Sequence, residues 1–168
     1  MLDTAQKATL KAFVEADPVL NLIPKTLDGA FELALRLQDA TTPDFWVWKT
    51  SLHEHEITGQ TSVDGTVWSW TAYIARTVGE RDGWVRMFNT SLSINPSLPN
   101  VRQGIADIFS GSANSAPAQR THLNTIARRK ANKLEGLFAT GTGSTASPGT
   151  MVIEGSLGYY EVYEAMGW

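Results

Sequence analysis

Two histidines separated by one residue form the only cluster of metal-type ligands in the chain. On a strand, alternate side chains face the same way, so His53 and His55 could share a metal through their imidazoles. The segment His53-Glu54-His55-Glu56 lacks the spacing of the metalloprotease helix motif. His122 would serve as a third ligand only in a fold that the sequence does not indicate. We therefore favour a polar surface loop, and a metal-dependent hydrolase built on this histidine pair stays a third hypothesis.

A second segment, FATGTGSTASPGT at residues 138–150, has the glycines and hydroxyls of a loop that could hold a phosphate. A P-loop also needs a lysine after its last glycine and a buried strand before the loop. This segment follows a predicted helix, and no lysine or arginine occurs after Lys133. The sequence therefore gives no support for a nucleotide site.

Nucleophilic catalysis is not indicated either. The chain has no cysteine and no Gly-x-Ser-x-Gly elbow around a serine. Glu154 and Glu161 could act as paired carboxylates, but acidic residues in an aromatic segment are more typical of groups that keep it soluble. We expect no enzyme: no catalytic residue, no metal and no cofactor.

One segment carries bases without compensating acids. No acidic residue occurs between Ile108 and Glu135, and the five bases of this segment are Arg120, Arg128, Arg129, Lys130 and Lys133. The local field should therefore be positive. On a helix wheel Arg128, Arg129 and Lys133 fall away from the apolar stripe, whereas Lys130 falls on it. We expect those three residues to meet phosphates or carboxylates, with a plain solvated face as the alternative.

The length, composition and net charge of the chain narrow the class of protein to which these residues can belong. A chain of 168 residues that is 42% hydrophobic is long enough for one domain with a core. Its net charge of −3 argues against a broadly basic nucleic-acid-binding surface. It has no cysteine for a disulfide and no run of about 18 apolar residues for a membrane span. We expect a soluble protein made in a cytoplasm.

The apolar spacing predicts a mainly α-helical fold. Helices are expected over residues 3–16, from Pro24 to about Gln38, and over 44–52, 67–77, 80–90, 101–111 and 117–138. Residues 53–66 read as a connecting loop. The segment 67–77 stays open between helix and strand, because its bulky residues also have high strand propensity.

The periodic apolar faces also predict the core. Its expected members are Phe31, Leu35, Trp70, Ile105, Ile108, Leu123, Ile126 and Leu134. Few basic residues lie beside the tryptophans at positions 46, 48, 68, 70 and 84, so we expect these to be buried rather than to stack on nucleic acid.

The last part of the chain presents a large apolar surface. The apolar and aromatic residues of this part form a set too large to leave in water: Met151, Val152, Ile153, Leu157, Tyr159, Tyr160, Val162, Tyr163 and Trp168. Alternation over residues 151–155 favours a short strand that pairs with a sheet edge. The loop Gly141–Gly149 before them lacks residues that would fix one conformation. The residues expected to bind a protein partner are Met151, Val152, Ile153, Glu154, Tyr159, Tyr160, Tyr163 and Trp168.

The order of these segments resembles the head–tail connector (adaptor or head-completion) proteins of tailed bacteriophages. The resemblance lies in short aromatic helices, then VRQGIADIFSG, then an arginine-bearing helix with ARRKANKLEGLFATGTGSTASPGTM, then VIEG and an aromatic tail. The resemblance covers residues 25 to 155. It lies in the order and residue composition of the segments rather than in a diagnostic motif.

The resemblance implies a helical bundle over residues 1–140 and a C-terminal docking arm over residues 141–168, with the glycine-rich loop as a hinge. It implies a structural virion protein without catalytic residues, assembled in the host cytoplasm into a ring, commonly of twelve copies. This ring would lie beneath the portal, in the neck between head and tail, and continue the DNA channel. Arg128, Arg129 and Lys133 would then face the channel or an adjoining acidic surface. The implied partners are the portal protein, neighbouring copies, a tail or stopper protein below, and passing double-stranded DNA in transient contact.

The residues also allow another class of protein. In a helical DNA-binding module, such as a small packaging (terminase) subunit, the helix with Arg128 would enter a groove and the tail would oligomerise. That alternative predicts a salt-dependent affinity of the isolated protein for duplex DNA, whereas the connector hypothesis predicts little or none.

Overall fold

The computed structural model describes residues 1–89 and 92–168. Over these residues the fold is mainly α-helical, as the apolar spacing predicted, with nine α-helices and two sheets of two strands each. The helices are short, because proline, glycine and capping residues interrupt the apolar periodicity often.

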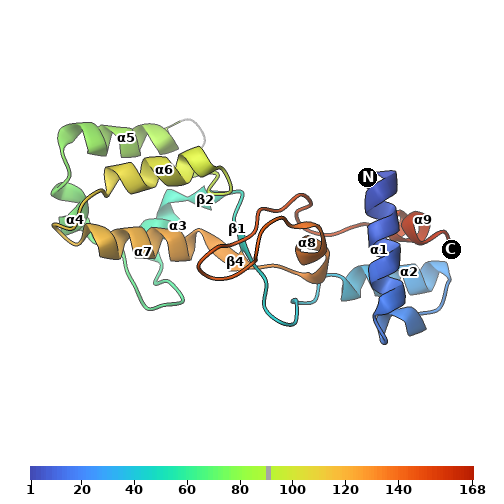
Figure 1. Ribbon diagram of the computed structural model, residues 1–168. Coiled ribbons are helices and arrows are strands. Elements are labelled where there is room, and N and C mark those ends of the chain that lie inside the picture. The colour runs from blue at the N-terminus through green and yellow to red at the C-terminus, as the bar shows by residue number, and fades with distance from the viewer. Residues whose placement is uncertain (90–91) are drawn as a thin grey trace. The chain divides into compact units, whose positions relative to one another are not determined.

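The chain folds into two compact units (Figure 1). Unit 1 consists of residues 1–47 and 130–168, and unit 2 of residues 48–129. The chain leaves unit 1 along β1 (Trp46–Trp48) and returns along β4 (Arg128–Lys130), and these strands form the first sheet. The predicted division at residue 140 therefore does not coincide with the units of the structure. The second part of unit 1 begins at residue 130, ten residues before the predicted division, and runs to residue 168.

Unit 1 contains four α-helices and one 3-10 helix: α1 (Thr4–Ala16), η1 (Leu20–Leu22), α2 (Leu27–Arg36), α8 (Lys133–Phe138) and α9 (Tyr159–Met166). Helix α1 starts where predicted, because the Asp3 side chain accepts the Gln6 N–H at 2.8 Å and the Gln6 side chain accepts the Asp3 N–H at 2.9 Å. It ends before Pro18. The buried side chains of α1, α2, α8 and α9 form one hydrophobic core.

The C-terminal segment belongs to that core and is not a free arm. Helix α9 packs against α1 and α2, and its Val162 is completely buried. Residues 151–155 do not form the expected strand. Instead, Thr150 bridges to Thr140, and the Gly155 N–H donates to Oε1 of buried Glu135 at 2.9 Å. Main-chain and side-chain contacts thus tie the tail to its own unit.

The glycine-rich loop wraps around the ring of Phe45. The Trp46 N–H donates to the Gly143 carbonyl at 2.7 Å, and the Gly149 N–H donates to the Trp46 carbonyl at 2.8 Å. Gly143 has φ of 65°, and a Cβ there would lie 2.3 Å from the Phe45 ring. The glycines are needed for this close approach, which accounts for the composition that resembles a phosphate loop.

The expected single helix over residues 117–138 is divided in two. Helix α7 (Ala116–Ile126) ends before β4, and α8 follows it. Lys130 would have interrupted the apolar stripe of a continuous helix; in β4 its side chain is exposed. The Ala131 N–H donates to the Phe45 carbonyl at 2.8 Å, and the Asn132 side chain accepts the Glu135 N–H at 2.8 Å to start α8.

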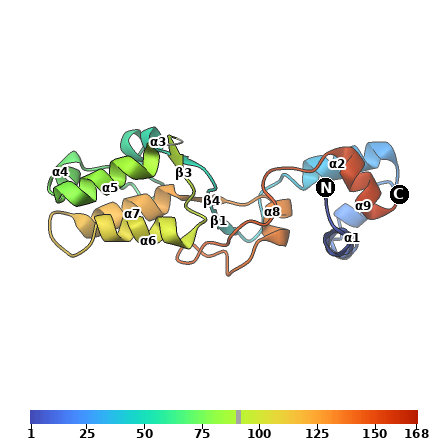
Figure 2. The same ribbon diagram turned by 90° about the horizontal axis from the view of Figure 1, so that it is seen from above.

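Unit 2 contains α3 (Glu54–Gly59), α4 (Trp70–Ile74), α5 (Val78–Phe88), α6 (Pro99–Ile108) and α7, with β2 (Leu52–His53) and β3 (Ser93–Ile94). Strands β2 and β3 are antiparallel, with Leu52 opposite Ile94. Helices α5, α6 and α7 run alongside one another (Figure 2). Aromatic side chains fill much of the core, where Trp68, Trp84 and Phe109 contact one another.

Several expected elements of unit 2 are present and others are corrected. Helix is correct within 67–77, where α4 lies, and within 80–90, where α5 lies; residue 90 is outside the described residues. The expected helix over 44–52 is wrong, because its aromatic and β-branched residues form β1. The expected loop over 53–66 contains α3.

The predicted core is correct at five of its eight positions. Ile105, Ile108, Leu123, Ile126 and Leu134 are buried. The side chains of Phe31, Leu35 and Trp70 are 55%, 51% and 57% exposed, so their placement in the core is wrong. Among the other tryptophans expected to be buried, those at 68 and 84 are buried, and those at 46 and 48 are partly exposed.

Candidate protein-binding surface

Helix α2 is apolar on two sides. Its inner side packs into the core of unit 1 through Ala30, Leu33 and Ala34, and Leu37 at its C-cap packs there too. Its outer side carries Leu27, Phe31 and Leu35 at successive helical turns, and these side chains are 40%, 55% and 51% exposed. A surface helix ordinarily turns a polar face to water. The outer stripe is therefore a feature that folding of unit 1 does not account for.

Local contacts fix where α2 begins. The Thr26 hydroxyl accepts the Gly29 N–H at 3.2 Å. A Cβ at Gly29 would lie 1.8 Å from the Pro24 carbonyl oxygen, so only glycine permits the entry of the chain into this helix. Asp28 in the first turn and Arg36 in the last complement the helix dipole.

Two tyrosines at the start of α9 extend the outer stripe. The rings of Phe31 and Tyr159 meet edge to face with centroids 6.1 Å apart, and those of Tyr159 and Tyr160 lie 4.3 Å apart. A side-chain hydrogen bond with Tyr160 raises the pKa of Tyr159. Tyr160 is 63% exposed. We call Leu27, Phe31, Leu35, Tyr159 and Tyr160 the α2–α9 surface.

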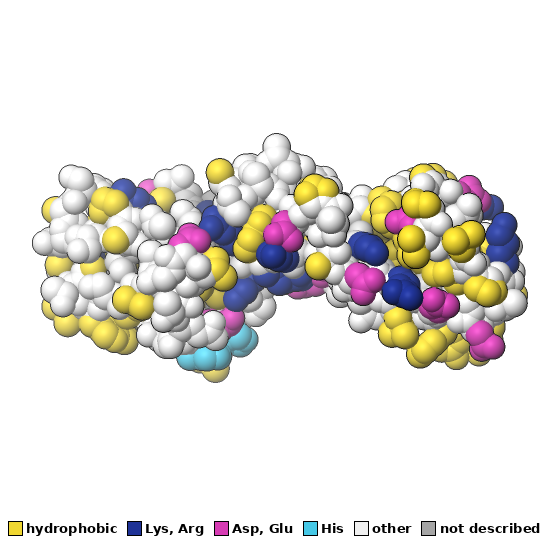
Figure 3. All heavy atoms as spheres, turned by 90° about the horizontal axis from the view of Figure 1, so that it is seen from below, with side chains coloured by type: hydrophobic (Ala, Val, Ile, Leu, Met, Phe, Trp, Pro, Cys, Tyr) yellow, Lys and Arg dark blue, Asp and Glu magenta, His cyan; other side chains and the backbone are white. Residues whose placement is uncertain are grey.

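Figure 3 shows hydrophobic side chains gathered on unit 1 with acidic and basic groups among them. Apolar and aromatic area bordered by charge is the usual composition of a protein-binding site. Tyrosine and phenylalanine supply large contact area at small cost in side-chain entropy. The chemistry of the α2–α9 surface therefore suits a protein partner.

Ion pairs join α9 to Met1 and to α1. The Glu161 carboxylate accepts the Gly158 N–H at 3.1 Å and pairs with the amino group of Met1 at 3.3 Å. These two contacts, the backbone hydrogen bond first, hold the pKa of Glu161 below its ordinary value. Lys7 of α1 pairs with Glu164 of α9.

The structure brings together only some of the tail residues that the sequence singled out. Tyr159 and Tyr160 join the α2–α9 surface. Tyr159 also packs against the core of unit 1, as do Ile153, Tyr163 and Trp168. The remaining three lie in the connecting segment: Met151 is partly buried, and Val152 and Glu154 are exposed.

The predicted DNA-facing residues do not share a helix face. Arg128 and Arg129 lie in β4, and Lys133 opens α8. Acidic residues accompany three bases of this segment: Arg128 with Asp64 at 3.2 Å, Lys130 with Asp44 at 2.8 Å, and Lys133 with Asp39 at 3.6 Å. These pairs reduce the positive potential that a phosphate backbone would meet.

The histidine pair lies at the N-terminus of α3 and not in a loop. The rings of His53 and His55 have centroids 5.4 Å apart. Burial raises the pKa of Glu56, but hydrogen bonds from Lys49 at 2.8 Å and from the His53 N–H at 2.9 Å outweigh this and lower it. Within residues 1–89 and 92–168, no three histidine or acidic side chains are grouped so as to hold a metal ion.

Unit 1 also has two concave regions. A groove of about 540 Å³ has Phe13, Phe45 and Leu137 in its wall. Its charged groups are engaged within the protein: Lys133 and Asp44 in ion pairs, and Asp17 by the N–H groups of residues 19 and 20, which lower the pKa of Asp17. The groove therefore offers little to orient a polar ligand.

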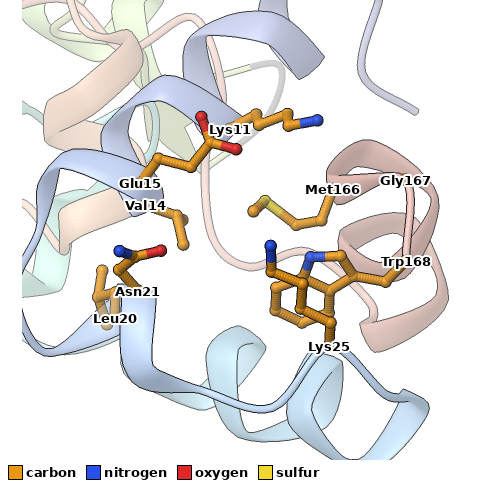
Figure 4. A pocket seen from close by; sticks show the side chains of 9 residues that line it. All are labelled: Lys11, Val14, Glu15, Leu20, Asn21, Lys25, Met166, Gly167 and Trp168. Carbon is orange, nitrogen blue, oxygen red and sulfur yellow. The ribbon is translucent and has the colours of Figure 1, made fainter.

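The second region is a pocket of about 110 Å³ beside Trp168 (Figure 4). Lys11 and Lys25 bring positive charge to its lining and Glu15 brings negative charge. Its volume is below the roughly 300–1,000 Å³ of typical small-molecule sites. The α2–α9 surface is thus the stronger candidate for function.

Comparisons of the chain with models of protein families, with curated proteins and with solved structures find no match. None of the helices in the described part of the chain has both the length and the apolar character needed to cross a membrane.

The sequence carried a signal for the α2–α9 surface. Seven of the eleven residues from Leu27 to Leu37 are Leu, Ala or Phe, and they occupy more than one stripe of the helix. One stripe of about 100° is enough to face a core. The excess apolar width therefore indicates a second contact face. Assigning all apolar positions to the core placed Phe31 and Leu35 wrongly.

Proposed function

We propose that this protein is a structural assembly protein whose α2–α9 surface binds another protein. Its specific class, on this proposal, is the head–tail connector of a tailed bacteriophage: a ring beneath the portal, in the neck of the virion, that joins head to tail and continues the DNA channel. Neighbouring copies, the portal, and a tail or stopper protein are its proposed partners.

The observation that carries the assembly role is the exposure of Phe31, Leu35 and Tyr160 on adjoining helices. Each side chain is more than half exposed, and Tyr159 links the two helices through its ring contacts. Burial of such aromatics contributes about 25 cal/mol per Å² of apolar area. The order of segments over residues 25 to 155 supports the connector class.

The alternative, a DNA-binding module such as a small packaging subunit, requires bases that are available to phosphates. The ion pairs of Arg128 and Lys133 with Asp64 and Asp39 favour the connector instead. The net charge of −3 points the same way. DNA in a connector ring would be in transient contact only.

The test combines two assays on the same purified protein. Mixed with purified portal rings of the same phage and imaged by electron microscopy, it should add a regular layer of density on one face of the ring. In a fluorescence anisotropy titration it should show little affinity for duplex DNA at physiological salt. The packaging module would be favoured if the protein binds DNA tightly with a steep salt dependence and the portal rings show no added density.

A further inference from the structure

We infer that the α2–α9 surface also binds the same surface of a second copy, with the two α2 helices antiparallel about a two-fold axis. This inference names a partner for the proposed binding surface. It rests on the proposed function only in taking the α2–α9 surface to be a protein-binding surface. Its argument is the self-complementary order of apolar and charged residues along α2.

The apolar stripe is symmetric about its middle residue. Leu27 and Leu35 lie four residues before and after Phe31, about 6 Å along the axis in each direction. In an antiparallel pair centred on Phe31, each Leu27 meets Leu35 of the second copy and the two Phe31 rings meet each other. A two-fold contact requires such a surface, because the same patch serves both copies.

The charges beside the stripe are arranged so that opposite signs meet. Asp28, Glu32 and Arg36 are exposed and lie one residue beyond each stripe residue, on one flank of the helix. Asp28 lies about 4.5 Å before the centre and Arg36 about 7.5 Å after it. Reversal of the partner helix puts Asp28 within about 3 Å, along the axis, of Arg36 of the second copy, and an arginine side chain spans that offset.

Glu32 lies about 1.5 Å past the centre, so the Glu32 carboxylates of the two copies lie on the same flank near the two-fold axis. Each already pairs with Arg36 of its own helix at 3.6 Å, which reduces their mutual repulsion, and each arginine then has a carboxylate from either copy within reach. The acidic first turn and basic last turn that match the helix dipole thereby also match an antiparallel partner. Tyr160 of α9 adds exposed aromatic area to the surface.

The contact is short, since α2 has ten residues. Interfaces that bury less than about 1,200 Å² are typically transient. The two-fold pair should therefore exchange with monomer, and the surface stays available to the portal. In the free protein the pair would cover apolar area that otherwise faces water.

Sedimentation equilibrium over a wide concentration series tests the inference by charge reversal. Asp28→Arg and Arg36→Asp each place like charges together twice per dimer, so each should weaken dimerisation roughly tenfold. The double variant D28R/R36D restores opposite charges and should recover the wild-type dissociation constant. Circular dichroism of each variant checks that α2 still folds.

A matched pair of apolar variants tests the stripe itself. Phe31→Asp should abolish the dimer, whereas Val85→Asp, at a side chain equally exposed in unit 2, should leave it intact. A monomer at all concentrations, equal effects of both variants, or a double variant as weak as the single ones would overturn the inference. Portal binding without a dimer would overturn this inference alone, and a dimer that does not bind portal rings would overturn the proposed function alone.

Discussion

Truncation of one side chain in α9 tests whether the C-terminal segment stabilises unit 1. Val162 is completely buried between α9 and the helices of its unit. Val162→Ala removes two methyl-sized groups, worth about 1.6 kcal/mol at about 0.8 kcal/mol each. The cavity left behind raises the expected loss to about 2 kcal/mol. Amide hydrogen exchange, which distinguishes α1 and α2 from unit 2, should become roughly 30-fold faster in the best-protected amides of these two helices.

Tyr160→Ala in the same helix is the control. The Tyr160 side chain is 63% exposed, so its loss should change stability by no more than about 0.5 kcal/mol. Unit 2 amides should keep their protection in both variants. If the amides of α1 and α2 are equally protected from exchange in Val162→Ala and Tyr160→Ala, the tail is not packed as described, and the result would support the C-terminal docking arm expected from the sequence.

Three further predictions concern unit 1. Gly143→Ala should cost about 1–3 kcal/mol in urea unfolding, because the residue has positive φ and lies against a ring, whereas Gly65→Ala, with φ of 77° but no neighbour within 4 Å, should cost less. The pKa of Glu161 is lower in the folded state than in the unfolded state, so the carboxylate stabilises the fold above about pH 4.3 and this stabilisation is lost as the pH falls through the pKa of the folded state. The urea midpoint of the wild-type protein should therefore drop between pH 7 and pH 3, and Glu161→Gln should make this drop smaller. An unchanged drop would contradict the prediction. Leu134→Ala at a fully buried site should cost about 2–5 kcal/mol by thermal melting and Phe31→Ala on the surface much less; equal shifts would refute the assignment of core and surface.

The sequence predicted those features that depend on local signals. Helix α1 follows from its capping residue and apolar spacing, and the burial of Leu123 and Ile126 follows from the periodicity of α7. The break after Ile126 depends on a long-range partner, since Ala131 and β4 pair with the segment around β1. The spacing of apolar residues does not predict such long-range pairing. Lys130 on the apolar stripe was nevertheless a local sign of the break.

Part of the candidate site could be predicted and part could not. The aromatic tail was correctly recognised as a segment that must be covered, and Tyr159 and Tyr160 do join the α2–α9 surface. Most of the cover, however, comes from α1 and α2 of the same chain, because Val162 and Met166 fill the core of unit 1. Apolar content shows that a segment needs a partner and does not show whether that partner is internal.

Binding of matched surface variants to portal rings tests the proposed function most directly. The affinities of the wild-type protein, Phe31→Asp and Val85→Asp for immobilised portal rings of the same phage are measured under one set of conditions. Both substituted side chains are 55% exposed, so neither variant should unfold its unit. The proposal predicts that wild type and Val85→Asp bind alike and that Phe31→Asp does not bind. Equal binding of all three, or no binding by the wild-type protein, would contradict it.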